Sequence, residues 1–198
     1  MSADSFTVLS TYEQSITLSK SKFIAFLFPC ISEASFKESL HEIKLKHPKA
    51  THHCFALLLT NPKRERAYDD GEPSGTAGLP ILGQLKSHRL INVGVVVVRY
   101  YGGTKLGVSG LIAAYKQSAA EVIANATMVS YVEHSTLIVR GDYPALMKCL
   151  SFCRQHAWRT TLTTIEGVQC LEIQCEKSEK QRIEDKISVF SNVTTYVL

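Results

Sequence analysis

Apolar and polar positions alternate along the first two thirds of the chain in a way that predicts short strands separated by helices. The expected strands lie at residues 6–9, 15–18, 22–28, 53–60 and 91–101. The first three follow one another closely, which predicts an antiparallel meander. Residues 91–101 form the most aliphatic run, so we expect a central strand that is buried on both faces.

Helical spacing of apolar residues fills the intervals between these strands. The expected helices lie at residues 32–47, 77–88 and 108–126. Ser32 is a suitable N-cap for the first helix, and Pro48 ends it. Pro80 is compatible with the second helix because it falls in the first turn, where a backbone N–H has no intrahelical acceptor.

The last third of the chain has the order β-α-β-β-α-β, which is typical of a ferredoxin-like fold. The strands are expected at residues 129–140, 158–165, 168–175 and 193–197. The helices are expected at residues 144–156 and from residue 178 onward. Ser178 and Gln181 can form a capping box at the start of that helix. The chain is therefore predicted to be an α+β protein of two domains, residues 1–128 and 129–198, with the boundary near Met128.

The charge is modest for a protein of 198 residues, because 22 basic residues face 18 acidic ones and leave a net charge of +4. An arginine-rich nucleic-acid binder would carry far more phosphate-facing cations. The whole excess lies in residues 1–130, so any polyanion should bind there. The N-terminus has no basic-then-apolar signal pattern and no run reaches the roughly 20 apolar residues of a membrane span, so we expect a cytoplasmic protein with no membrane partner.

Six cysteines occur without a C-x-x-C pair, which favours reduced thiols packed as small apolar side chains. A zinc site is the alternative, formed by Cys149, Cys153, Cys170 and Cys175. Cys170 and Cys175 are separated by an odd number of residues and should point to opposite faces of a strand. Core packing is therefore the preferred interpretation, and no metal or other cofactor is expected.

A glycine-rich turn follows the most aliphatic strand and precedes a helix. Such a turn is suited to anion binding, because glycines let backbone N–H groups approach a phosphate at the positive end of the helix. Arg99 and Lys105 add positive charge. The turn matches neither known phosphate-loop pattern, G-x-x-x-x-G-K-[ST] or G-x-G-x-x-G. The alternative is that its glycines only supply positive φ and close packing.

Residues 61–76 are polar, rich in turn formers and too long for a tight hairpin, which predicts a functional loop. Asp69, Asp70 and Glu72 could together hold a hard cation, or they could belong to a rigid acidic turn. Thr76 or Ser74 is a candidate cap for the helix that follows.

His52 and Cys54 should share one face at the start of the strand near residue 53, while His53 points to the other face. A Cys–His nucleophilic pair is one interpretation of this arrangement. The other is one surface histidine and one partly buried histidine beside a loop.

Two long motifs at this point resemble the signature of the IMPACT (imprinted and ancient) family, in its bacterial, YigZ-like branch. They are DDGEPSGTAG at residues 69–78, followed by Gly83, and VVRYYGGTKLG at residues 97–107. The resemblance implies a first domain similar to the second domain of a small-subunit ribosomal protein and to domain IV of the translocating elongation factor. It also implies a second, ferredoxin-like domain similar to domain V of that factor. No enzymatic activity follows from the resemblance.

These likenesses point to the ribosome, RNA or a translation regulatory protein as partner, with no sequence-specific DNA binding. Eukaryotic relatives restrain an amino-acid-starvation kinase by binding its activator, but they carry an additional N-terminal domain that does not precede the first motif here. The leading hypothesis is therefore a non-enzymatic binding or regulatory protein linked to translation.

We expect the two motifs and a neighbouring histidine to form one recognition surface. Its candidate residues are Arg99, Tyr100, Tyr101, Gly102, Gly103, Thr104, Lys105 and Gly107 from the turn, Asp69, Asp70, Glu72 and Thr76 from the loop, and His52. Only one of the two tyrosines can face the same side as Arg99. The alternative function is an enzyme or binder of a phosphorylated small molecule, with Mg²⁺ on the acidic residues and Lys105 on the phosphate.

Overall fold

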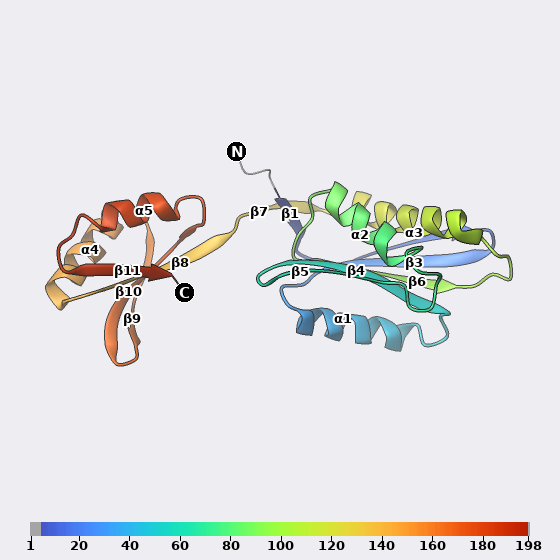
Figure 1. The fold of residues 1–198 in the computed structure, drawn as a ribbon, viewed down its shortest axis with the longest axis horizontal. Helices are drawn as coiled ribbons and strands as arrows, with labels where there is room; N and C mark the ends of the chain where they lie inside the picture. The colour runs from blue at the N-terminus through green and yellow to red at the C-terminus, as the bar shows by residue number, and fades with distance from the viewer. Residues whose placement is uncertain (1–4, 198) are drawn as a thin grey trace. The chain divides into compact units, whose positions relative to one another are not determined.

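The computed structural model describes residues 5–197, which divide into two compact units (Figure 1). The division lies between Tyr131 and Val132, close to the boundary expected near Met128. It falls slightly later because strand β7 (Met128–Tyr131) pairs with β1 (Ser5–Val8) and so belongs to the first unit. Mixed helices and antiparallel sheets make the chain an α+β protein, as predicted.

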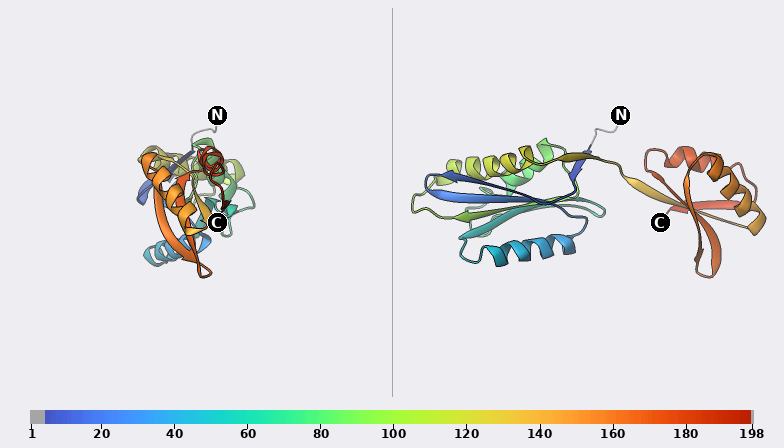
Figure 2. Two further views of the ribbon diagram at one scale, coloured as in Figure 1. Left: turned by 90° about the vertical axis from the view of Figure 1, so that its left-hand side faces the viewer. Right: turned by 180° about the vertical axis from the view of Figure 1, so that it is seen from behind.

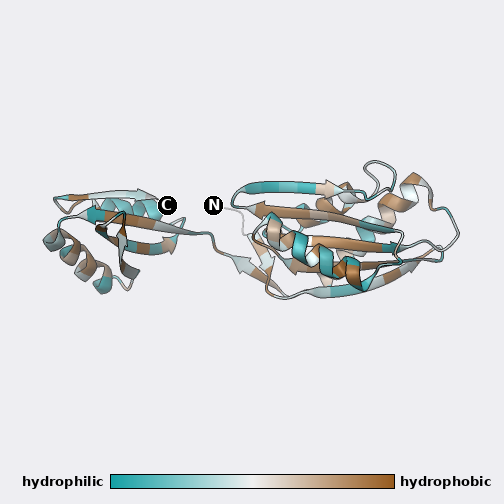
Figure 3. Ribbon diagram, turned by 90° about the horizontal axis from the view of Figure 1, so that it is seen from below, coloured by the Kyte–Doolittle hydropathy of each residue, from teal (hydrophilic) through white to brown (hydrophobic). Residues whose placement is uncertain are grey.

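The first unit is built on a five-stranded antiparallel sheet with the order β2-β3-β6-β4-β5. These strands are β2 (Tyr12–Leu18), β3 (Ser21–Pro29), β6 (Val93–Tyr100), β4 (His52–Thr60) and β5 (Lys63–Tyr68). The aliphatic strand β6 lies in the middle of the sheet, as its composition predicts. Figure 3 shows hydrophobic inner strands and a hydrophilic strand at one edge, in agreement with the exposure of every residue of β5.

Helices cover both faces of this sheet (Figures 1 and 2). Helix α1 (Glu33–Lys46) packs on one face, and α2 (Gly78–Ser87) and α3 (Gly107–Ala124) pack on the other. Because successive side chains of a strand point to opposite faces, Phe26 of β3 joins the α1 core and Leu27 joins the α2 and α3 core. Within a strand of this sheet, consecutive core residues therefore face opposite helix layers.

Two expectations for the first unit are wrong. Strand β1 does not join the meander with β2 and β3, because its backbone pairs with β7 instead. Within the expected loop of residues 61–76, Lys63–Tyr68 forms strand β5 and pairs with β4. Apolar and polar residues do not alternate in β5, which begins with four charged residues, because an edge strand can expose both of its faces. The Ser32 cap is confirmed, and its side chain accepts from Ser35 N.

The second unit is a four-stranded antiparallel sheet with the order β11-β8-β10-β9. Its elements are β8 (His134–Gly141), α4 (Tyr143–Gln155), β9 (Arg159–Ile165), β10 (Val168–Glu176), α5 (Lys180–Ile187) and β11 (Val193–Val197). Both helices pack against one face of the sheet through a single apolar core. The strand expected over residues 129–140 is two strands, β7 and β8.

Helix α5 begins without the expected capping box. The Ser178 hydroxyl bonds to Glu176, and no side chain caps the first turn, whose N-cap residue is Glu179. Cys170 lies outside the core that holds Cys175, in agreement with their odd separation. Within residues 5–197, no helix is both long and apolar enough to cross a membrane.

Candidate functional site

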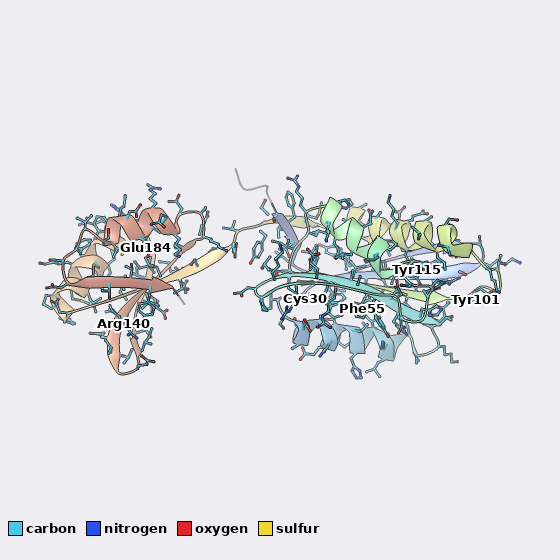
Figure 4. The ribbon with its side chains drawn as sticks, in the orientation of Figure 1. Cys30, Phe55, Tyr101, Tyr115, Arg140 and Glu184 are labelled. Carbon is cyan, nitrogen blue, oxygen red and sulfur yellow. The ribbon has the colours of Figure 1, made fainter. Side chains whose placement is uncertain are left out.

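A pocket of about 460 Å³ lies in the first unit where β4 begins, β6 ends and α3 begins. It is lined by Thr51, His52, Glu72, Pro73, Arg99, Tyr101, Lys105, Leu106, Gly107, Val108 and Leu111. Both sequence motifs therefore reach the same hollow, although a helix and a strand separate them in the chain. Figure 4 shows Tyr115 on α3 and Tyr101 just past the end of β6.

Asp69 organises the acidic loop by accepting backbone hydrogen bonds. Its carboxylate accepts from the N–H groups of Gly75 at 2.8 Å, Ala77 at 3.0 Å and Gly78 at 2.8 Å. Burial raises the pKa of Asp69, but these donors stabilise the charged form more strongly and hold the pKa below its ordinary value. Asp69 thus provides an acceptor for the backbone N–H groups of Ala77 and Gly78, which begin α2 and have no acceptor within the helix.

Neither Thr76 nor Ser74 caps α2, contrary to expectation. No side chain at the N-cap position makes a capping bond, and the buried Thr76 hydroxyl donates to the Pro73 carbonyl oxygen at 2.7 Å. Asp69 takes this role instead. It lies eight positions before Ala77 and nine before Gly78, too far for a local capping pattern to identify it.

Asp70, a candidate residue of the recognition surface, does not line the pocket. Its Oδ2 accepts from the backbone N–H of His53 at 2.6 Å and lies 3.9 Å from His53 Nδ1. Its carbonyl oxygen accepts from Nδ1 of His52 at 2.7 Å. Asp70 therefore does not orient Arg99 or Lys105, and it holds the start of β4 instead.

Glu72 makes the ion pair that joins the two motifs. Its Oε1 accepts from Arg99 Nη1 at 2.6 Å and from the Tyr115 hydroxyl at 2.7 Å. Both side chains of the pair are nearly inaccessible, at 6% and 4% exposure. Burial raises the pKa of Tyr115, so its hydroxyl stays protonated and donates.

Arg99 is a buried structural cation. Its Nη2 donates weakly to Ser21 Oγ at 3.4 Å, and its guanidinium lies 5.4 Å from the Phe23 ring centroid and 5.5 Å from that of Tyr101. Because Glu72 already neutralises it, Arg99 is not the free phosphate-binding cation that the motif suggested. Its Nε has no hydrogen-bond partner among the described residues.

Cys54 is unsuited to nucleophilic chemistry. The fully buried thiol donates toward the Asp69 carbonyl oxygen at 2.9 Å and lies 3.3 Å from the Tyr115 hydroxyl. Burial raises its pKa to about 12, so the reactive thiolate is scarce at neutral pH. Of the two interpretations of this strand, the structure favours a packed cysteine over a Cys–His pair.

The two tyrosines of the turn face opposite sides of the sheet, as strand alternation predicts. Tyr100 bonds to Nδ1 of His47 at 3.0 Å, on the α1 side. Tyr101 lines the pocket with 46% of its surface exposed, and its backbone N–H donates to Thr51 Oγ1 at 3.1 Å. Lys105 is exposed at the same pocket and forms no ion pair within residues 5–197.

The glycines of the turn have separate physical roles. A Cβ on Gly102 would lie 2.0 Å from the Lys20 carbonyl oxygen, so only glycine permits this approach. Gly103 and Gly107 have positive φ values of 83° and 70°. Gly107 lines the pocket, while Gly102, Gly103 and the exposed Thr104 do not.

Three polar residues of this site were missed from the sequence: Thr51, Tyr115 and Ser21. Four apolar residues that line the pocket were missed as well: Pro73, Leu106, Val108 and Leu111. Tyr115 carried a usable signal, because a hydroxyl on the buried face of α3 needs a polar partner. Thr51 and Ser21 lie beside strand ends and gave no signal that separates them from ordinary polar residues.

Comparison with known proteins agrees with the motifs. Residues 19–123 match the model of the Impact N-terminal domain, which spans both motifs and all of the pocket. The chain is 41% identical over 177 residues to the IMPACT family member YvyE of Bacillus subtilis, covering 89% of this chain and 81% of that protein. It is 41% identical over 101 residues to YigZ of Escherichia coli, covering half of each.

A protein from Haemophilus influenzae, also described as an IMPACT family member, is 34% identical over 142 residues, covering 70% of this chain and 69% of that protein. One solved structure, described as the crystal structure of an hypothetical protein, covers 100% of this chain and 98% of its own at a TM-score of 0.72 and 24% identity. At that identity the likeness shows the fold alone. With the motifs, the domain match and these relatives together, the chain belongs to the IMPACT family, in the branch that its bacterial members YvyE and YigZ represent.

Proposed function

We propose that this chain is a non-enzymatic RNA-binding module connected with translation, and that the first unit holds one unstacked nucleotide in the pocket beside Tyr101. The observation that carries the proposal is that the half-exposed Tyr101 ring lines the same pocket as Lys105, which has no ion-pair partner in the described part of the chain. Proteins that bind single-stranded RNA combine these two features, because every base has a π-face for stacking and every nucleotide carries a phosphate.

The rest of the pocket suits the same ligand. Leu106, Val108 and Leu111 provide an apolar wall, and the beginning of α3 at Gly107 adds the positive end of a helix near Lys105. Arg99 lies beneath the Tyr101 ring and supports it as a stacking surface. Lys105, and not Arg99, is therefore the residue that would contact phosphate.

The connection with translation rests on the family and on the likeness to ribosome-associated domains that the motifs implied. The strand order β11-β8-β10-β9 supports a ferredoxin-like second domain, since it is the order that a split βαβ fold produces. For the first unit, a five-stranded sheet with helices on both faces, we propose a likeness to the second domain of a small-subunit ribosomal protein.

The alternative, a phosphorylated small molecule bound with Mg²⁺, has less support. Asp69 directs its carboxylate to three backbone donors, and Asp70 directs its own to His53 N. The third carboxylate, of Glu72, is engaged by Arg99 and Tyr115. The acidic loop therefore uses its carboxylates to hold the fold, and they do not converge on one ion.

RNA affinity of four variants tests the proposal. Filter binding of a single-stranded RNA decamer at low salt should weaken about 5- to 100-fold in Tyr101→Ala, the range expected for loss of one base stack. Lys105→Ala should weaken binding by a few-fold and lower the salt dependence by about one counterion. Lys116→Ala, an exposed lysine on α3, and Tyr143→Ala, an exposed tyrosine of the second unit, are the matched controls.

Absence of binding at low salt would overturn the proposal, and so would equal effects of the site and control variants. Thermal melting in the presence of sugar phosphates and nucleotides with Mg²⁺ tests the alternative. A saturating ligand of the native state would raise the melting temperature, and the RNA module predicts no rise with sugar phosphates.

A further inference from the structure

His52 and Glu72 place two hydrogen-bond acceptors side by side in the wall of the pocket. His52 Nδ1 lies 2.7 Å from the carbonyl oxygen of Asp70, and because a carbonyl can only accept, Nδ1 carries the hydrogen. In the neutral ring this leaves Nε2 as an acceptor. Nε2 lies 3.8 Å from Glu72 Oε1, which is also an acceptor.

The protein leaves this acceptor pair without a shared donor. The separation of 3.8 Å is too long for a hydrogen bond between the two groups. Nε2 of His52 makes no hydrogen bond within residues 5–197, and 19% of the side chain is exposed. Glu72 Oε1 receives Arg99 and Tyr115, while Oε2 receives no donor from the described residues. A ligand that fills this part of the pocket must therefore present donors.

One planar amino group matches the spacing. If a nitrogen lies about 2.9 Å from both acceptors, the angle between the two acceptors at that nitrogen is roughly 80°. The two N–H bonds of a planar amino group diverge by about 120°. Each N–H bond would therefore point within about 20° of one acceptor. Both hydrogen bonds would then keep a favourable angle. A carbonyl or phosphate oxygen in the same place would face two acceptors and be repelled.

The surroundings of the acceptor pair favour an amino group carried on a flat ring. Tyr101 offers a stacking face, and Leu106, Val108 and Leu111 are apolar. A lysine ammonium has three donors, so at least one would point at these apolar groups or lose its hydration. An amino group conjugated to an aromatic base has only two donors, and its ring buries against the apolar wall.

We infer that the pocket recognises the exocyclic amino group of a nucleobase, which donates one hydrogen to His52 Nε2 and the other to the Glu72 carboxylate. This inference rests on the proposed RNA binding and adds selectivity to it. Adenine, cytosine and guanine carry such an amino group, whereas uracil presents a carbonyl oxygen in its place. The pocket therefore discriminates against uracil.

A pair of ligands that differ only in the amino group tests the inference without altering the protein. Fluorescence anisotropy compares a hexamer of adenosine with a hexamer of purine riboside, which has hydrogen in place of the 6-amino group. The wild-type chain should bind the adenosine hexamer about tenfold more tightly or better, because the purine riboside leaves His52 Nε2 unpaired and gives the buried Glu72 carboxylate no further donor. In His52→Ala this ratio should fall toward one. His41→Ala, on the exposed face of α1, should keep the wild-type ratio.

The possible outcomes distinguish failure of amino-group recognition from failure of the proposed RNA binding. Equal wild-type affinity for the two hexamers would overturn amino recognition and leave RNA binding intact. No binding of either hexamer at low salt would overturn both. A retained preference in His52→Ala would also contradict the inference, because the acceptor that it assigns would then be dispensable.

Discussion

The two faces of the five-stranded sheet are built on different principles. The α1 face packs aromatic and aliphatic side chains, and Phe36 contacts Phe28 and Phe55 with ring centroids 5.7 Å and 4.9 Å away. The α2 and α3 face is equally apolar over most of its area but ends in a buried charged network around Glu72. Among the described residues, Glu72 and Arg99 are the buried carboxylate and guanidinium of this unit, and both line the pocket. The position of this pair separates the part of the unit that maintains the fold from the part that we propose binds a ligand.

Neighbouring residues on one strand illustrate the contrast. His52 faces the α3 side and leaves Nε2 directed to the pocket, while His53 faces the α1 side with Nε2 buried and unpartnered among the described residues. A one-residue step along β4 thus changes a histidine from a candidate ligand-binding group to a group held in the interior.

The largest expected effect is the loss of one partner of the buried ion pair. Arg99→Met should lower the free energy of unfolding by about 3–5 kcal/mol, because it leaves the Glu72 carboxylate buried and uncompensated. Phe36→Ala on the α1 face should cost a similar 3–5 kcal/mol through loss of packing. Urea denaturation followed by circular dichroism measures both.

A second substitution distinguishes the two faces. Adding Glu72→Leu to Arg99→Met should recover a large part of the lost stability, since replacing both charges removes the desolvation penalty. No single substitution elsewhere should repair Phe36→Ala, whose defect is a cavity. If the double variant is less stable than Arg99→Met, the network is more than an ion pair, and the contrast between the faces would need another cause.

A smaller effect is expected from pH on the α1 face. Burial lowers the pKa of His53 below its ordinary value of 6.5. Asp70 and a hydrogen bond to the His47 backbone oppose this shift, while the charges of Lys44 and His47 reinforce it. As pH falls, His53 therefore becomes protonated at a higher pH in the unfolded chain than in the folded chain. The stability that neutral His53 contributes is complete above about pH 6.5 and is lost as pH falls through the lower folded pKa.

Melting temperatures between pH 7.5 and 5 measure this contribution. The wild-type chain should lose stability over this window, and His53→Leu should lose less, by up to the slope of one proton. His41→Gln, an exposed control on α1, should follow the wild type. Parallel curves for His53→Leu and the wild type would show that another group governs the acid loss.

Most elements of the fold could be predicted from local pattern, because core strands and amphipathic helices carry their periodicity in the sequence. The central position of β6 follows from its aliphatic composition, and the Ser32 cap follows from its residue type. The pairing of β1 with β7 could not be predicted, since it joins segments more than a hundred residues apart and depends on main-chain hydrogen bonds.

The sequence identified the segments that form the site but not the hydrogen bonds and ion pairs between them. Glycine motifs brought the loop and the turn to attention because special backbone conformations leave a residue signature. Which of three carboxylates meets Arg99 depends on φ values such as the positive one at Asp70, and no residue-type rule selects Glu72. For the same reason the sequence suggested a free Arg99, whereas the structure pairs Arg99 with Glu72 and shows no ion pair for Lys105 with any described residue.

Mapping the bound RNA residue by residue tests the central proposal most directly. Backbone amide chemical shifts of the ¹⁵N-labelled chain, recorded during titration with the adenosine hexamer, report where the ligand lies. We predict the largest changes at Thr51, His52, Tyr101, Lys105 and Gly107, with saturation at one hexamer per chain. Changes confined to the second unit or to the α1 face, with these five amides unmoved at saturation, would contradict RNA binding at this pocket.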